Sequence, residues 1–219
     1  MADQKRMSFR KVLETGLTGL TILSGTALLL YAIAQLIAFS AFGGFDPNYS
    51  VSELKANFEK NETAIYELKQ YFNQIVPRNK LVEIEFDGDC TLSRLGLGTL
   101  SLATGKPNQD LRLYSNLGID SKAADSVLEN LGWTDETLRD LKAKLDAAGC
   151  IGVVSGEPTK INFHRSGLGM YSFDVFNEHI PDSQQRCYND SCTYIMVNDK
   201  LVLEYGGGVA GEQCFYKLN

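Results

Sequence analysis

Few residues in this chain of 219 could carry out catalysis, and its two histidines are the natural starting point. His164 and His179 could combine with Ser166, Asp174 and Glu178 in a hydrolytic site, which needs a nucleophile beside a base. No motif such as G-x-S-x-G places a nucleophile beside either histidine. We interpret His164 as an exposed strand histidine and predict no catalytic residue.

A glycine-rich run over residues 206–211 formally matches the dinucleotide motif G-x-G-x-x-G. That motif binds pyrophosphate only where a helix follows it, because the helix N-terminus holds the phosphates. The residues that follow predict instead a final strand over 213–218. The run is therefore interpreted as a flexible connection between two strands, and no cofactor is predicted.

The five cysteines, at positions 90, 150, 187, 192 and 214, all follow the most apolar part of the chain. We predict one disulfide among Cys187, Cys192 and Cys214, either closing a local loop from Cys187 to Cys192 or joining Cys192 to the last strand at Cys214. The odd count leaves at least one thiol free or paired between chains. With two histidines and no C-x-x-C spacing, no metal site is predicted.

The elements that must position these residues begin with an apolar stretch that has no charged residue between Glu14 and Asp46. A bilayer core takes about 20 apolar residues as a helix, and basic flanks stay in the cytoplasm. Because Lys and Arg gather at residues 5–11, we predict a cytoplasmic tail over 1–15, a single transmembrane helix over 16–42 and an extracytoplasmic remainder.

Two alternatives concern this same stretch. A cleaved signal peptide could end at the small residues 32–34, although the apolar run continues beyond them. Gly16, Gly19 and Gly25 could let the helix pack closely against other membrane helices, or could reflect ordinary membrane-helix composition.

Residues 50–76 predict a long amphipathic helix, which begins at a capping box formed by Ser50 and Glu53 and ends before Pro77. Its seam residues recur every three or four positions: Val51, Leu54, Phe58, Asn61, Ile65, Leu68 and Phe72. One interpretation is a coiled coil that pairs two chains as a homodimer, with Asn61 setting the register. The other is a helix packed on its own domain.

Residues 77–219 predict one extracytoplasmic α+β domain. Apolar residues alternate with polar ones over 82–86 and again over 170–176, as in half-buried strands. Two capped helices lie between them, starting after Ser121 and Thr134 and ending at Gly132 and Gly149. The fold class expected is α+β with a mainly antiparallel sheet and a helix pair.

The charge balance limits the classes of partner. A formal net charge of −6 argues against nucleic acid, because phosphate binding needs a basic surface. The sequence favours a protein anchored in the lipid bilayer whose exported domain binds a protein partner, as a scaffold or accessory subunit of a membrane or envelope assembly. The alternatives are an exported enzyme of unknown class, which would use His164 or a free cysteine, and a membrane-anchored inhibitor or immunity protein.

Overall fold

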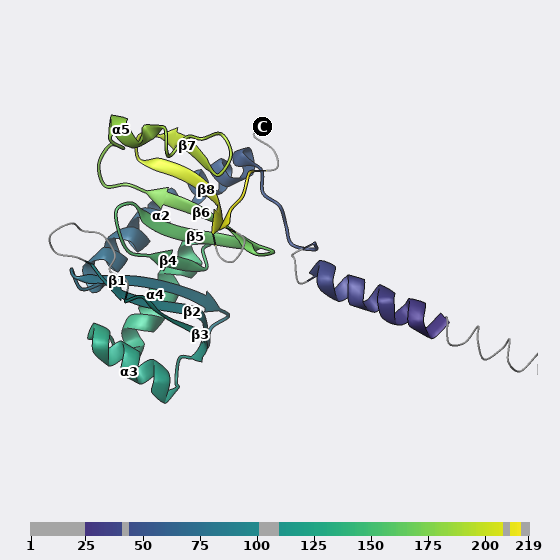
Figure 1. The fold of residues 1–219 in the computed structure, drawn as a ribbon. Helices are drawn as coiled ribbons and strands as arrows, with labels where there is room; N and C mark the ends of the chain where they lie inside the picture. The colour runs from purple at the N-terminus through teal and green to yellow at the C-terminus, as the bar shows by residue number, and fades with distance from the viewer. Residues whose placement is uncertain (1–24, 41–43, 101–109, 208–210, 216–219) are drawn as a thin grey trace, which may run out of the picture. The chain divides into compact units, whose positions relative to one another are not determined.

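The computed structural model describes residues 25–40, 44–100, 110–207 and 211–215 (Figure 1). The chain divides into two compact units, Met1–Asp46 and Pro47–Asn219.

In the first unit, residues 25–40 form a helix whose large apolar side chains, such as Leu28 and Ile37, are exposed. The predicted transmembrane helix over 16–42 is wrong: within the described ranges, no helix combines the length and the apolar character that crossing a bilayer takes. The predicted tail over 1–15, Gly16 and Gly19 lie outside the described residues, and Gly25 has no neighbouring atom within 4 Å of where a Cβ would lie.

The second unit begins with α2 (Val51–Ile75), which has the predicted capping box between Ser50 and Glu53. Six of its seven seam residues are buried in the hydrophobic core of the same unit, and Asn61 is half-buried. Phe58, for example, packs edge-to-face on Phe173 of the sheet, with ring centroids 5.5 Å apart. This is the arrangement that the packed-helix interpretation describes.

The described strands form a nine-stranded sheet in the order β3-β2-β1-β4-β5-β6-β8-β7, with β9 pairing β8, and each of these pairs is antiparallel. The strands are β1 (Lys80–Asp87), β2 (Thr91–Thr99), β3 (Arg112–Gly118), β4 (Gly152–Val154), β5 (Thr159–Ser166), β6 (Gly169–Val175), β7 (Tyr194–Asn198), β8 (Leu201–Gly207) and β9 (Gly211–Glu212). The prediction of α+β structure with an antiparallel sheet is confirmed; that of a strand over 213–218 is wrong for its described part, because residues 213–215 have no strand pairing.

Two further helices follow their predicted caps. Ser121 and Thr134 accept hydrogen bonds from backbone N–H groups at the starts of α3 (Lys122–Leu131) and α4 (Asp135–Ala148). Gly132 and Gly149 end them in the left-handed region that favours glycine. α4 packs against α2, and Figure 1 shows both behind the sheet.

One face of the sheet is therefore covered by helices and the other is largely uncovered. Strand alternation sends Ile84, Ile161, Phe173 and Leu203 into the helix-covered core, where each is at most 1% exposed. The intervening residues lie on the other face. A short segment containing α5 (Asp182–Gln185) covers only the end near β7, where Ile180 packs in a small cluster with Val202.

Candidate functional site

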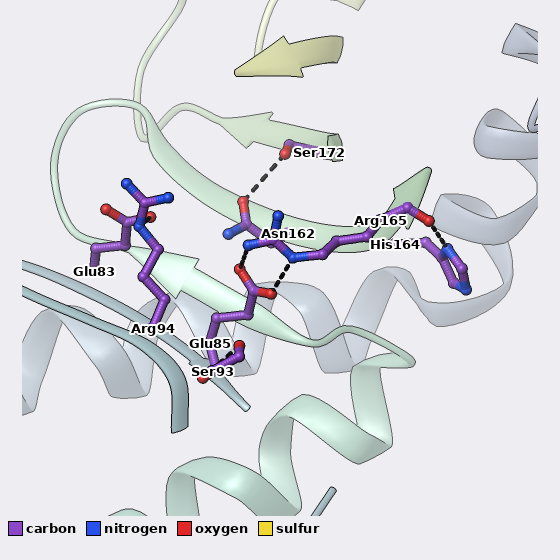
Figure 2. A network of polar contacts seen from close by, with 8 residues as sticks. All are labelled: Glu83, Glu85, Ser93, Arg94, Asn162, His164, Arg165 and Ser172. Carbon is purple, nitrogen blue, oxygen red and sulfur yellow. Dashed lines mark hydrogen bonds and ion pairs between the residues drawn. The ribbon is translucent and has the colours of Figure 1, made fainter. Parts of the chain in front are cut away.

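A polar depression of about 230 Å³ lies on the uncovered face of the sheet. Its lining comes from β1, β2, β5, β6 and β8, and from Val154 at the end of β4. The lining residues are Glu83, Glu85, Arg94, Val154, Lys160, Asn162, Arg165, Met170, Ser172, Glu204 and Gly206. We call this set the uncovered-face depression; Figure 2 shows its central polar contacts.

Glu85 and Arg165 form its central ion pair. Arg165 donates from Nε to Glu85 Oε1 at 2.5 Å and from Nη2 to Oε2 at 2.7 Å (Figure 2). The Glu85 side chain is 3% exposed and that of Arg165 is 40% exposed. This two-point geometry fixes the guanidinium plane, so the pair is rigid as well as charged.

A bulge in β5 brings Arg165 to this face. The pairing of β5 with β6 shifts between Asn162 and His164, so that one extra residue enters β5. Beyond the shift the alternation is reversed: Arg165 is opposite Met170 on the uncovered face, while His164 is opposite the core residue Tyr171.

A second bulge acts in the same way beside β1. The register between β1 and β2 shifts after Glu85, which leaves Glu85 opposite Arg94 and Phe86 opposite Leu92. Arg94 then pairs through Nε with Glu83 Oε1 at 2.8 Å. Ser93, the extra residue, donates its hydroxyl to the carbonyl oxygen of Glu85 at 3.2 Å (Figure 2).

The third ion pair joins Lys160 Nζ to Glu204 Oε2 at 2.5 Å. Burial by itself lowers the pKa of Lys160, but Asp174 and Glu204 together raise it above its ordinary value. The ammonium therefore stays charged, and it holds a carboxylate whose side chain is only 7% exposed.

Asp174 lies next to this pair and is 2% exposed. Burial, and then repulsion by Glu204, raise its pKa well above the ordinary value, against the attraction of Lys160. Its Oδ1 has no hydrogen-bond partner within the described parts of the chain. The same surroundings, burial first and then Glu204, raise the pKa of Tyr194 to about 12. Asp174 is thus a carboxyl that retains its proton more readily than an exposed one.

The floor of the depression is uncharged and closely bonded. Ser172 donates its hydroxyl to Asn162 Oδ1 at 3.1 Å, and both side chains are buried (Figure 2). Gly152 is opposite Glu85 in the β1–β4 pair, and a Cβ there would lie 2.6 Å from the carbonyl oxygen of Ile84. Glycine at this position allows β4 to approach β1 and keeps the hollow free of a side chain.

The residues considered for hydrolysis do not come together. His164 Nδ1 contacts the carbonyl oxygen of Arg165 at 2.5 Å, and its ring lies beside Tyr49 (Figure 2). Ser166 donates its hydroxyl to Asn48. His179 instead pairs with Asp199 at the surface. In the described part of the chain, neither histidine contacts a serine or cysteine that could act as a nucleophile.

The cysteines resolve the two disulfide alternatives in favour of Cys192–Cys214. Cys192 precedes β7 and Cys214 follows β9, and the backbone N–H of Phe215 donates to the carbonyl oxygen of Cys192 at 3.0 Å. Cys187 is free and exposed. Burial raises the pKa of Cys150 to about 12, so this thiol is not a nucleophile at neutral pH.

Neither a cofactor nor a metal site was predicted from the sequence. The glycine run leads from β8 into β9, and residues 211–215 contain no helix. Among the residues that the structure describes, no three His, Cys, Asp or Glu side chains gather as a metal site would require.

The uncovered-face depression has no local signal in the sequence, because its ion pairs join distant parts of the chain. Glu83 and Glu85 alternate with apolar residues and signal a polar strand face. Nothing local in the sequence shows that Arg165, 80 positions away from Glu85, is their neighbour. Searches against protein-family models, curated proteins and solved structures give no match to this chain, so its function must be argued from this geometry.

Proposed function

We propose that the sheet domain is a non-enzymatic binding module that holds a protein partner at the uncovered-face depression. The observation that supports this most is the set of three ion pairs on a sheet face that helices leave uncovered. Buried ion pairs add little net stability, because desolvation offsets their attraction. Their value is larger in recognition, where they set specificity and orientation.

The size of the depression favours a protein over a small molecule. Ligand pockets usually enclose roughly 300–1,000 Å³, whereas this hollow measures about 230 Å³ and is open to solvent. Such a volume accepts one or two side chains of a partner. The cations of the depression are already paired with carboxylates. The depression therefore presents a fixed pattern of positive and negative charges to a partner, and not a single charge without a counter-ion.

Charge favours a partner with a basic surface. The chain carries a formal net charge of −6, and long-range attraction accelerates association with an oppositely charged surface. Glu83, whose side chain is 20% exposed, lies where the depression meets solvent and can contact that surface.

We also propose that the domain functions outside the cytoplasm. The support is the Cys192–Cys214 bond, because disulfides persist mainly in oxidising compartments. Opening a loop of this size costs about 3 kcal/mol of stability. A Cys192→Ser/Cys214→Ser chain should therefore unfold at lower urea concentration than the oxidised wild type.

The binding proposal is tested by quantitative affinity purification of the full chain from its native host. Arg94→Ala removes a half-buried cation of the depression, and Arg139→Ala is the matched control, since Arg139 is exposed on α4. We expect a stoichiometric protein that wild type and Arg139→Ala retain equally and that Arg94→Ala loses by about tenfold or more. Circular dichroism must show that both variants are folded.

Two results would overturn the proposal. One is the absence of any stoichiometric protein with folded wild-type chain. The other is a bound protein whose retention does not change in Arg94→Ala, because that partner would contact a different surface.

A further inference from the structure

A second hollow lies against α2, away from the ion pairs of the uncovered face. It measures about 630 Å³ and is lined by Tyr66, Lys69, Gln70, Asn73, Gln74, Phe176, Asn177 and Lys200. The lining comes from the last turns of α2, the residues after β6 and the turn before β8. We call it the Lys69 cavity. None of its residues belongs to the uncovered-face depression.

Lys69 is the unusual member, because it is 4% exposed yet its ammonium has no carboxylate partner. No Asp or Glu oxygen lies within 4 Å of its Nζ, and it donates no side-chain hydrogen bond, in the described ranges of the chain. Lys160 has its carboxylate in Glu204, and Lys142 has two, in Asp89 and Asp146. The ammonium is not one of the fully enclosed, unpartnered polar atoms of the described residues, so it meets solvent in the cavity and is accessible to an anion that enters it.

Glu157, the acid whose charge acts most strongly on Lys69, has other hydrogen-bond partners. Glu157 accepts hydrogen bonds from the backbone N–H of Asn177 at 2.7 Å and from its side-chain amide at 2.5 Å. Burial lowers the pKa of Lys69, and Glu157 opposes that change while Lys200 adds to it. Glu157 thus keeps its negative charge near Lys69, but its oxygens bond to Asn177 and make no ion pair with the Lys69 ammonium.

The rest of the cavity suits an anion with an organic body. Lys200 brings a second ammonium, which donates to the carbonyl oxygen of Asn177 at 3.0 Å and has further protons to offer. Gln70 and Gln74 supply amide groups along the helix. Tyr66 and Phe176 supply aromatic surface for an apolar group.

We propose that the Lys69 cavity is a binding site for a small organic anion, whose carboxylate or phosphate pairs with Lys69 and Lys200 and whose apolar part contacts Tyr66 and Phe176. The volume falls in the usual range for small-molecule sites. The site is independent of protein binding at the depression, and either proposal can fail alone.

The test uses the full chain and three probes of similar shape: phenylacetate, phenyl phosphate and the neutral phenylacetamide, at constant ionic strength. Thermal unfolding and calorimetric titration measure binding. We expect saturable stabilisation by at least one of the two anions and none by phenylacetamide. The stronger anion identifies the head group as a carboxylate or a phosphate.

Lys69→Met keeps the length of the side chain and removes its charge, and Lys60→Met on the exposed side of α2 is the matched control. Because Lys69→Met keeps the mostly buried chain and removes a charge that has no carboxylate partner, we expect a folded variant about as stable as wild type without probe. Anion affinity should fall by about tenfold or more in Lys69→Met and stay unchanged in Lys60→Met. Lys200→Met should also weaken binding and gives a second readout if Lys69→Met fails to fold.

The proposal is overturned if neither anion stabilises the wild-type chain more than phenylacetamide does. It is equally overturned if the anions bind Lys69→Met and Lys200→Met as well as they bind Lys60→Met.

Discussion

The two faces of the sheet are equally buried in places but chemically opposite. On β1, β5 and β6, the residues Ile84, Ile161 and Phe173 face the helices at 0–1% exposure. On the same strands Glu85 and Asp174 face the other way at 2% exposure. Burial therefore does not distinguish the two faces. On the helix-covered face apolar contacts stabilise the fold, whereas on the other face ion pairs merely offset the cost of desolvating charged side chains.

If the uncovered face binds a partner as proposed, this contrast separates the residues that stabilise the fold from those that recognise the partner. The helix-covered face supplies the free energy that holds α2 and α4 on the sheet. The uncovered face contributes little to that free energy, and its charges are the groups that the proposed partner would recognise. Substitutions on the two faces should therefore differ in size and in kind.

The largest effect is expected on the helix-covered face. Phe173→Ala removes a ring that packs on Phe58 and Phe163, and leaves a cavity between α2 and the sheet. The free energy of unfolding should fall by about 3–5 kcal/mol, measured by urea denaturation. A loss below about 1 kcal/mol would show that this face does not carry the stability.

A smaller loss is expected when one partner of the central pair is removed. Glu85→Gln leaves Arg165 without its carboxylate, but the guanidinium is 40% exposed and can be hydrated. We expect a loss of about 2 kcal/mol in the same urea experiment. Glu83→Gln is the matched control, because its pair with Arg94 is more exposed on the carboxylate side and should cost less than about 1 kcal/mol. Equal losses in both variants would contradict the special position of Glu85.

Asp174→Asn should change how the stability of the folded chain depends on pH. The folded chain holds the Asp174 proton above the ordinary pKa of 3.8, so the folded state binds more protons than the unfolded state in that range. Stability therefore falls as pH rises from about 4 through the raised pKa. The groups that interact electrostatically with Asp174 are Glu204, Lys160, Tyr188 and Tyr194. The asparagine variant lacks this decline.

Urea denaturation from pH 4 to pH 8 checks this expectation. The variant should match wild type at the acid end and become the more stable protein as pH rises. A difference that is constant over the range, or that widens toward acid pH, would show that Asp174 does not titrate as described.

The sequence predicted the helix-covered face well, because its signals are local. The caps at Ser50, Ser121 and Thr134 and the alternation of apolar residues depend on neighbours within a few positions. The side chains of the uncovered face were not predicted as a site, since two bulges reverse the alternation and place Arg94 and Arg165 beside Glu83 and Glu85. Strand pairing across 80 positions cannot be read from a single sequence.

In the N-terminal region, an element was predicted that the structure contradicts. The region's lack of charge predicted a membrane span over 16–42, whereas no helix within the described residues is long and apolar enough to cross a membrane. Composition measures how apolar a stretch is and leaves the length of the helix open.

The most direct test of the central claim replaces the central ion pair by apolar residues of similar size, in Glu85→Leu/Arg165→Met. If the uncovered face serves recognition and not stability, the double variant should unfold within about 1 kcal/mol of wild type in urea, or be more stable, while Glu85→Gln alone is destabilised. The same double variant should lose the protein that wild type retains. A loss of stability as large as that of Phe173→Ala would contradict the account, because the ion pair would then hold the fold together.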